Sequence, residues 1–288
     1  MTASVVRLFS EGEQPLQETH LHTNDPGLFG PNSVSWKVMG DVSSFVGGVR
    51  ALLLQALHPE VAAGVADHSQ YKTDPLGRLN RTSFFVTTVN YGAMPEVQEA
   101  VAVVRAAHKP VSGTSERGIA YSANQPQLGA WVQNTLTDSF LDAYQNFCQP
   151  LEPKDADRFV LEQSKIGELL GISELPLTAR ELREWITEHP QLGSSEALRQ
   201  AWTFLQKPPL QPSQLLGYRI VRAAAVSTLP TNLAELANAS SPRGSFFAGR
   251  RLIASLRWAL KHSPSWKAAL DRCGAPYDAR TFRSFEDR

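Results

Sequence analysis

The sequence predicts an all-α protein, because helical spacing of apolar residues recurs along the chain while two-residue alternation is nearly absent. In residues 41–57, for example, Val42, Phe45, Val49 and Leu52 follow spacings of three and four, which place them on one face of a helix. Prolines also stand where helices would begin, the position at which a helix tolerates them. The only candidate strand is a weak one at residues 84–89.

The predicted helices are separated by short stretches rich in proline, glycine and asparagine. In chain order they cover residues 41–57, 59–69, 76–90, 95–108, 126–147, 154–171, 178–189, 194–206, 212–227, 246–262 and 264–273. Residues 112–125 contain two glycines and are expected to form a loop. The predicted organisation is an N-terminal extension, residues 1–35, followed by one helical domain, residues 36–288, with a core over about 36–230.

The composition excludes several classes of protein. Lys plus Arg and Asp plus Glu both number 28, so no global field would draw the chain onto nucleic acid or anionic lipid. The two cysteines form no CxxC pair, which argues against a disulfide framework or a thiolate zinc site and suits a reducing compartment. No signal peptide is recognisable, and the longest apolar stretches are too short to span a bilayer. We therefore expect a cytoplasmic protein without an integral membrane segment.

His108 is the principal candidate for chemistry. Val97, Val101, Val104 and His108 follow one another at spacings of four, three and four, so we expect the imidazole to lie on the buried stripe of its helix. Neutral imidazole is a good axial ligand for haem iron, and small apolar neighbours suit a porphyrin face. The alternative is a histidine that is simply satisfied within the core.

The run Arg78-Leu79-Asn80-Arg81-Thr82 supplies polar side chains one helical turn apart. Arg78 and Arg81 could bind a propionate, a carboxylate substrate or iron-bound oxygen, because guanidinium is a permanently charged donor. They could equally form a solvated helix face with salt bridges. Thr82 could donate a hydrogen bond to iron-bound dioxygen, or bond back to its own helix.

Two glycines interrupt the helix expected at residues 41–57. Gly47 and Gly48 each cost about 1 kcal/mol of helix stability, a cost that usually permits the close approach of another helix or a flat cofactor. The remaining histidines are weaker candidates. His58, at a His-Pro junction, is expected to be structural. A surface position is expected for His20, His22, His68, His189 and His262.

Other chemistries find no support in the sequence. GxGxxG and GxxxxGK[ST] are both absent, which removes the usual phosphate cradles. GxSxG, which would seat a nucleophilic serine, is also absent. Without a Glu-x-x-His motif, a ferritin-like di-iron bundle is not expected.

At these residues the chain resembles the rubber-oxygenase catalytic domain family. The matching segments are GDVSSFVGGVRALLLQALHP, DPLGRLNRT, VNYG, VRAAHKPVSG and YSANQP, at residues 40–59, 74–82, 89–92, 104–113 and 121–126. No single motif is decisive, but their order and spacing make a specific joint signal. The last hundred residues carry no motif of the family.

The resemblance implies a helical fold with a globin-like core, a b-type haem, and His108 as the proximal iron ligand. Arg78 and Thr82 look like the counterparts of distal-pocket residues, and Arg81 stands where the family's latex-clearing protein has lysine. Because guanidinium is too rarely deprotonated to bind iron, the distal position is expected to hold water, hydroxide, dioxygen or another residue.

Known activities of the family cleave a carbon–carbon double bond of an isoprenoid with dioxygen. The expected function is therefore a haem-dependent oxygenase acting on a small apolar alkene. The rival is a haem-binding sensor, carrier or weak peroxidase without oxygenase turnover, and a helical scaffold with a dead haem site is a third possibility. The substrate, the oligomeric state and the role of His58 stay open at this point.

Overall fold

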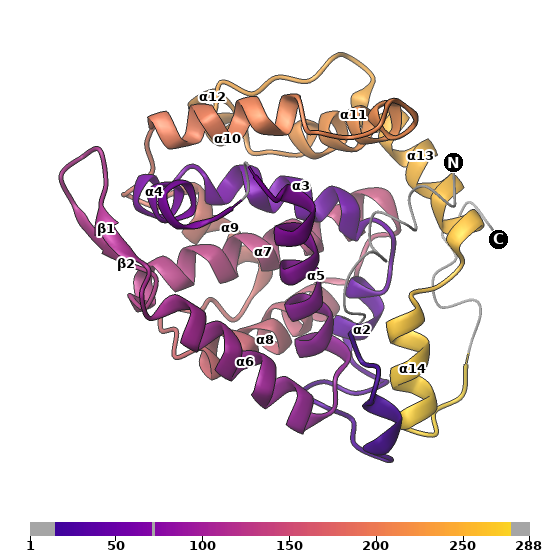
Figure 1. The fold of residues 1–288 in the computed structure, drawn as a ribbon. Helices are drawn as coiled ribbons and strands as arrows, with labels where there is room; N and C mark the ends of the chain where they lie inside the picture. Colours follow the sequence, from indigo (N-terminus) through magenta and orange to yellow (C-terminus); the bar gives the residue numbers. More distant parts are fainter. Residues whose placement is uncertain (1–14, 71–72, 278–288) are drawn as a thin grey trace.

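The computed structural model describes residues 15–70 and 73–277, and in these ranges the chain is predominantly helical, as predicted (Figure 1). None of the described helices is both long and apolar enough to cross a membrane. The elements are η1 (Thr19–Leu21), α2 (Val34–Met39), α3 (Ser44–Gln55), α4 (Pro59–His68), α5 (Pro75–Tyr91), α6 (Met94–His108), β1 (Ser112–Thr114), β2 (Ala120–Ser122), α7 (Pro126–Phe147), α8 (Pro153–Leu169), α9 (Ala179–Thr187), α10 (Glu196–Gln206), α11 (Pro212–Ser227), α12 (Thr231–Leu236), α13 (Ser245–Leu260) and α14 (Pro264–Arg272).

Helix α7 is the central element, with α3 packed along it and α8, α9 and α13 also in contact (Figure 1). Gly47 of α3 is where the two helix backbones approach closely. A side chain there would meet Phe140 Cδ1 at 2.8 Å and the carbonyl oxygen of Ser139 at 3.0 Å. The first alternative for the paired glycines, the approach of a helix, therefore applies at Gly47.

A buried ion pair joins the same two helices. Arg50 of α3 is fully buried and donates to Asp138 Oδ2 at 2.6 Å and to Ser139 Oγ at 2.9 Å. Arg183 of α9 contacts Asp138 from the other side at 3.2 Å and Asp142 at 2.9 Å. Three helices thus share one charge network, which compensates the cost of burying the arginine.

Helices α11 and α13 pack against each other, with α11 also against α3. The inward side of α13 carries Gly249, Ile253 and Arg257. Arg257 donates to both carboxylate oxygens of Asp41, at 2.6 and 3.0 Å, and to the carbonyl oxygen of Phe147 at 2.8 Å. These bonds fix the rotation of α13 about its axis.

Helices α5 and α6 form a hairpin whose turn is held by distant parts of the chain. Arg272 of α14 donates to the carbonyl oxygens of Tyr91, at 2.8 Å, and Asp25, at 2.7 Å. Asp25 in turn accepts from the Met94 backbone N–H at 2.9 Å. Thr19 of η1 donates to Glu96 Oε2 at 2.8 Å. Residues near both chain ends thus converge on this turn.

Several local predictions differ from the structure. Residues 84–89 are helical, within α5, because their apolar side chains pack with helical rather than alternating spacing. Residues 112–125 contain a small antiparallel hairpin, in which Gly113 pairs with Tyr121. Helix α2, which begins within the expected extension, was not predicted, although Ser33 caps it by accepting from the Trp36 N–H at 3.1 Å. The short elements η1 and α12 were also not predicted.

Candidate functional site

The first turn of α5 orders the residues of the RLNRT run. Asp74 caps the helix by accepting from the Gly77 N–H at 2.9 Å. The same carboxylate holds Arg81, whose Nη1 lies 3.2 Å from Asp74 Oδ2, with both side chains largely exposed. For Arg81, the structure therefore shows the solvated salt bridge that was one of the two alternatives.

Arg78 and Thr82 lie one turn apart on α5. Arg78 is partly buried, and its carbonyl oxygen accepts a hydrogen bond from the Thr82 hydroxyl at 3.1 Å. Thr82 therefore bonds back to its own helix here, while the hydroxyl oxygen keeps its capacity to accept. Thr82 and Arg81 are exposed.

His108 is the last residue of α6, and the expectation that it lies on a buried stripe was wrong. The stripe is buried at Val97 and Val101 and partly buried at Val104, whereas His108 is exposed. The reason is that α6 extends beyond the side chains of other elements that cover its first turns. The cluster that includes Val97 and Val101 also contains Ile166 of α8, and residues of α6 beyond Val101 are not part of it.

The imidazole of His108 remains chemically available. Its backbone oxygen accepts from Asn124 Nδ2 at 3.3 Å, but no hydrogen bond joins the ring to any described residue. Desolvation by nearby protein atoms lowers the pKa of this imidazole below its ordinary value. A lowered pKa keeps the ring neutral at pH 7, and neutral imidazole is the form that binds a metal.

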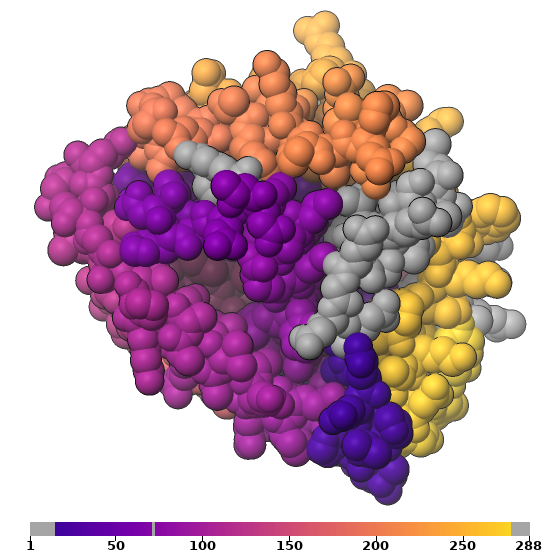
Figure 2. Space-filling view, viewed as in Figure 1, coloured from indigo at the N-terminus to yellow at the C-terminus, as the bar shows by residue number. Residues whose placement is uncertain are grey.

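The two helices bring these residues to the same end of the hairpin. Arg78 precedes the end of α5 by 13 residues, and His108 follows the start of α6 by 14, so both lie about 20 Å from the turn. Figure 1 shows α5 and α6 diverging from that turn, and Figure 2 shows the surface hollowed between them. Arg78 and His108 therefore both lie at the end of the hairpin away from the turn, on different helices.

Apolar side chains near this end of the hairpin are incompletely covered. Leu79 of α5 is 36% exposed and Val103 of α6 is 61% exposed. Further apolar side chains that pack on the main core while remaining partly buried come from α3, α5 and α7, namely Leu52, Val86, Leu128, Val132 and Leu136. A protein interior seldom leaves so much apolar surface uncovered on adjoining helices unless a ligand covers it.

Gly48 adds open space on α3. A side chain built at this residue would meet no heavy atom of the described residues within 4 Å, in contrast to Gly47. Gly48 and Leu52 lie one helical turn apart, so they share a face. Of the two glycines predicted to contact a cofactor, the structure leaves room only beside Gly48, since α7 fills the space beside Gly47.

A second polar cluster surrounds His58 and His189. His58 is buried, and its Nε2 lies 3.0 Å from Gln191 Oε1. His189, which was predicted to lie at the surface, is half-buried, and its ring lies 4.9 Å from the Trp131 ring and 4.7 Å from the Trp185 ring. Burial in this cage, with His58 nearby, lowers the pKa of His189 to about 4. Its polar neighbours in the sequence gave no signal of this packing.

The Glu60 carboxylate connects this cluster to the β-hairpin. It accepts from Ser115 Oγ at 2.7 Å and pairs with Arg117, and its Oε2 lies 3.3 Å from His58 Nδ1. The Arg117 hydrogen bonds contribute to a lowered pKa of Glu60, against the opposing effect of burial. His58 is thus buried at the His-Pro junction and tied to the β-hairpin through Glu60.

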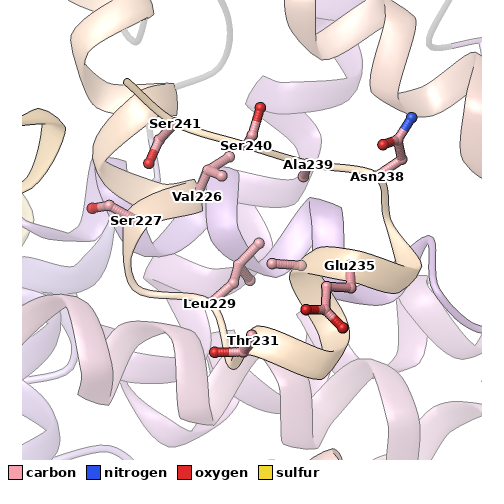
Figure 3. Close-up of a pocket in the computed structure, with 10 residues that line it drawn as sticks. Val226, Ser227, Leu229, Thr231, Glu235, Asn238, Ala239, Ser240 and Ser241 are labelled. Carbon is pink, nitrogen blue, oxygen red and sulfur yellow. The ribbon is translucent and has the colours of Figure 1, made fainter. Parts of the chain in front are cut away.

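Surface depressions elsewhere lack the residues expected for catalysis. One, of about 390 Å³, lies between the end of α11, helix α12 and the segment that follows, and is lined by small side chains with one carboxylate, Glu235 (Figure 3). Another, of about 360 Å³, lies beside Trp185. Within residues 15–70 and 73–277, no group of three or more His, Cys, Asp or Glu residues could hold a metal ion.

The fold is predominantly helical, and its α5–α6 hairpin carries Arg78, Thr82 and His108. The family described as ER-bound oxygenase mpaB/B'/rubber oxygenase, catalytic domain, matches residues 36–258, and the chain belongs to this family of oxygenases. The match contains the whole hairpin. No curated protein and no solved structure matches the chain significantly.

Proposed function

We propose that this protein is a haem b-dependent oxygenase that acts with dioxygen on a small apolar substrate containing a carbon–carbon double bond. The proposal rests on the α5–α6 hairpin, which carries Arg78 and the exposed imidazole of His108 away from its turn, near apolar side chains that are incompletely covered. Membership of an oxygenase family supports the same reading.

The residues present fit a haem. One neutral histidine without a hydrogen-bond partner among the described residues is the donor set that a haem iron needs from the protein. The uncovered apolar side chains of α3, α5, α6 and α7 suit the faces of a porphyrin. The empty side of Gly48 permits close approach of a flat group to α3. Bound haem would supply the dioxygen chemistry that side chains cannot perform.

The side chains of the chain itself would have distinct tasks. His108 would hold the cofactor through a ring nitrogen. Arg78 would bind a haem propionate or orient dioxygen by hydrogen bonding, because its charge is permanent. Thr82 would assist it after turning its hydroxyl away from the Arg78 carbonyl. Arg81 would stay protonated and paired with Asp74, so it would not bind the iron.

The substrate class follows from the apolar side chains beside Arg78 and Thr82 on α5. Leu79 and Val86 offer apolar contact rather than hydrogen-bonding groups, so they favour an unfunctionalised hydrocarbon such as an isoprenoid alkene over a polar metabolite. Cleavage of its double bond with dioxygen would give two carbonyl products.

The test begins with absorption spectra of purified protein supplied with haem, in the resting state, after reduction and with carbon monoxide. We expect a Soret band that shifts in the last two states, and that is lost or altered in His108→Ala. His20→Ala is the matched control, because His20 is exposed and lies in η1, outside the hairpin. A colourless wild-type protein would overturn the proposal.

Oxygen uptake with isoprenoid alkenes, together with mass spectrometry of carbonyl products, then separates the oxygenase from its rival. Arg78→Ala is expected to retain haem and to lose turnover by a factor on the order of a hundred, whereas Arg180→Ala, at an exposed salt bridge on α9, should not. Haem binding without alkene-dependent oxygen uptake would indicate a sensor, carrier or weak peroxidase.

A further inference from the structure

The C-terminal third of the chain carries a strong local excess of basic residues. Between residues 197 and 270, Glu235 is the only acidic residue, while ten positions are Lys or Arg. The whole chain is nevertheless neutral, so its acidic residues are concentrated elsewhere. Charge asymmetry of this size gives one side of a protein a positive field even when the net charge is zero.

Helix α13 presents this excess together with large exposed apolar side chains. Trp258 is 84% exposed and Phe247 is 68% exposed. These two residues are 11 positions apart, which is about three helical turns, so they lie on the same face of α13 about 16 Å apart. Arg251 is exposed between them. The helix contains no acidic residue.

The buried side of α13 shows that this exposure is built into the fold. Gly249, Ile253 and Arg257 lie on the side opposite Phe247 and Trp258, and Arg257 is fixed by its bonds to Asp41. A side chain at Gly249 would meet Ala224 of α11 at 2.5 Å, so this face of α13 is pressed against its neighbour. Rotation of α13 to hide the aromatic residues would break these contacts.

The adjoining helix α11 continues the same surface chemistry. Leu216 is 65% exposed, and Arg219, three residues later, is exposed as well. Helices α11 and α13 contact each other along the outside of the molecule (Figure 1). Arg243 and Lys261, which flank the two ends of α13, are also exposed.

We propose that the exposed face of α13, with Phe247, Trp258 and Arg251, docks the protein onto the surface of an anionic lipid bilayer. Lipid is the occupant that satisfies both features, because aromatic side chains enter the headgroup region while arginines meet lipid phosphates. A nucleic acid would match the arginines but leave Phe247 and Trp258 without a comparable apolar environment. The docking is independent of the oxygenase proposal.

The test is sedimentation of the full chain with vesicles of phosphatidylcholine containing phosphatidylglycerol, beside vesicles of phosphatidylcholine alone. We expect binding to the anionic vesicles that weakens at high salt. Replacement of Phe247 and Trp258 together by Ala should reduce the partition coefficient by a factor on the order of ten or more, and Arg251→Glu by about fivefold or more. These exposed replacements should change the free energy of unfolding little.

Two substitutions on α8 serve as matched controls. Leu161→Ala removes an apolar side chain that is 49% exposed, and Lys154→Glu reverses an exposed charge. Both should leave vesicle binding unchanged. Quenching of tryptophan emission by brominated lipid, lost in Trp258→Ala, would show that this side chain enters the bilayer.

Three results would overturn the proposal. The first is no binding to anionic vesicles at low salt. The second is binding that falls equally in the α8 control variants. The third is evidence for another occupant, which could take two forms. One form is a dimer that sedimentation velocity detects without lipid and that Trp258→Ala converts to monomer. The other form is retention of the protein on duplex DNA but not on vesicles. Either form of the third result would assign the surface to a different occupant.

Discussion

Replacing Arg257 by methionine is expected to destabilise the protein more than the same replacement at Arg50, although Arg50 is the more deeply buried of the two. Removal of Arg257 leaves the buried carboxylate of Asp41 without its charged partner, although the Ser43 N–H still donates to it at 2.8 Å. It also removes a donor from the carbonyl oxygen of Phe147. A buried charge that loses its partner costs about 3–5 kcal/mol.

The expected cost at Arg50 is smaller, about 1–3 kcal/mol, since Arg183 still contacts both Asp138 and Asp142. Two nitrogens of Arg50, Nε and Nη2, are buried without a hydrogen-bond partner, and methionine removes that penalty. For a chain of 288 residues, an unfolding entropy of about 0.6 kcal/mol/K converts these costs into a fall in Tm of about 5–8 °C for Arg257→Met and about 2–5 °C for Arg50→Met.

Thermal unfolding followed by circular dichroism measures both variants, and a third variant isolates the cause. Asp41→Asn combined with Arg257→Met removes the uncompensated charge, while the amide oxygen can still accept from Ser43. The double variant should therefore be less destabilised than the sum of the single changes. Strict additivity, or a larger fall in Tm for Arg50→Met than for Arg257→Met, would refute the reasoning.

Three further outcomes are expected. In urea denaturation, Gly47→Ala should destabilise the protein by about 1–3 kcal/mol, because the new methyl group would meet Phe140. Gly48→Ala should be neutral or stabilise the protein by up to about 1 kcal/mol. Equal effects of the two substitutions would contradict the assignment of open space to Gly48. Haem binding, measured by the Soret band, should be lost as the pH is lowered, with a midpoint below about 6.5. The reason is that desolvation lowers the pKa of His108 and only the neutral ring binds iron. A midpoint of haem loss above about 6.5 would argue against His108 as the ligand. Between about pH 6.5 and pH 4 the unfolded chain takes up a proton at His189 that the folded chain does not. The free energy of unfolding should therefore fall as the pH is lowered through this window, and it should fall less steeply in His189→Phe. Parallel curves for the two proteins would exclude His189 as the source.

The long helices could be predicted from the sequence because each has a strong boundary signal and a continuous apolar stripe. For α7, Pro126 and Phe147 were predicted as the ends, and both are its ends in the structure. For α11, the predicted range 212–227 is likewise the observed one. Short elements lack such redundancy: the strands Ser112–Thr114 and Ala120–Ser122 are mostly exposed, so no alternation of apolar side chains marks them.

The roles proposed for the residues of the candidate site stay predictions, whereas the exposure of His108 could not be predicted from the sequence. Periodicity placed His108 on the face of Val97 and Val101, which is the correct face of α6, but periodicity cannot show whether another element covers that face. His189 shows the converse limit, because one side of its aromatic cage is Trp131 of α7, which is 58 positions away in the chain. Net charge has a similar limit, since a neutral total does not show that residues 197–270 contain one acidic and ten basic residues.

The clamp on the α5–α6 turn has a consequence for any shortened version of the protein. Residues 36–258, the part that matches the family, include His108 and Arg78 but omit Asp25 and Arg272. Those omitted residues hold the backbone of Tyr91 and Met94 at the turn. A fragment cut to the matched region would thus retain every proposed haem-binding side chain while losing what sets the angle of the hairpin. We therefore expect the part of the chain that folds stably to extend beyond residues 36–258.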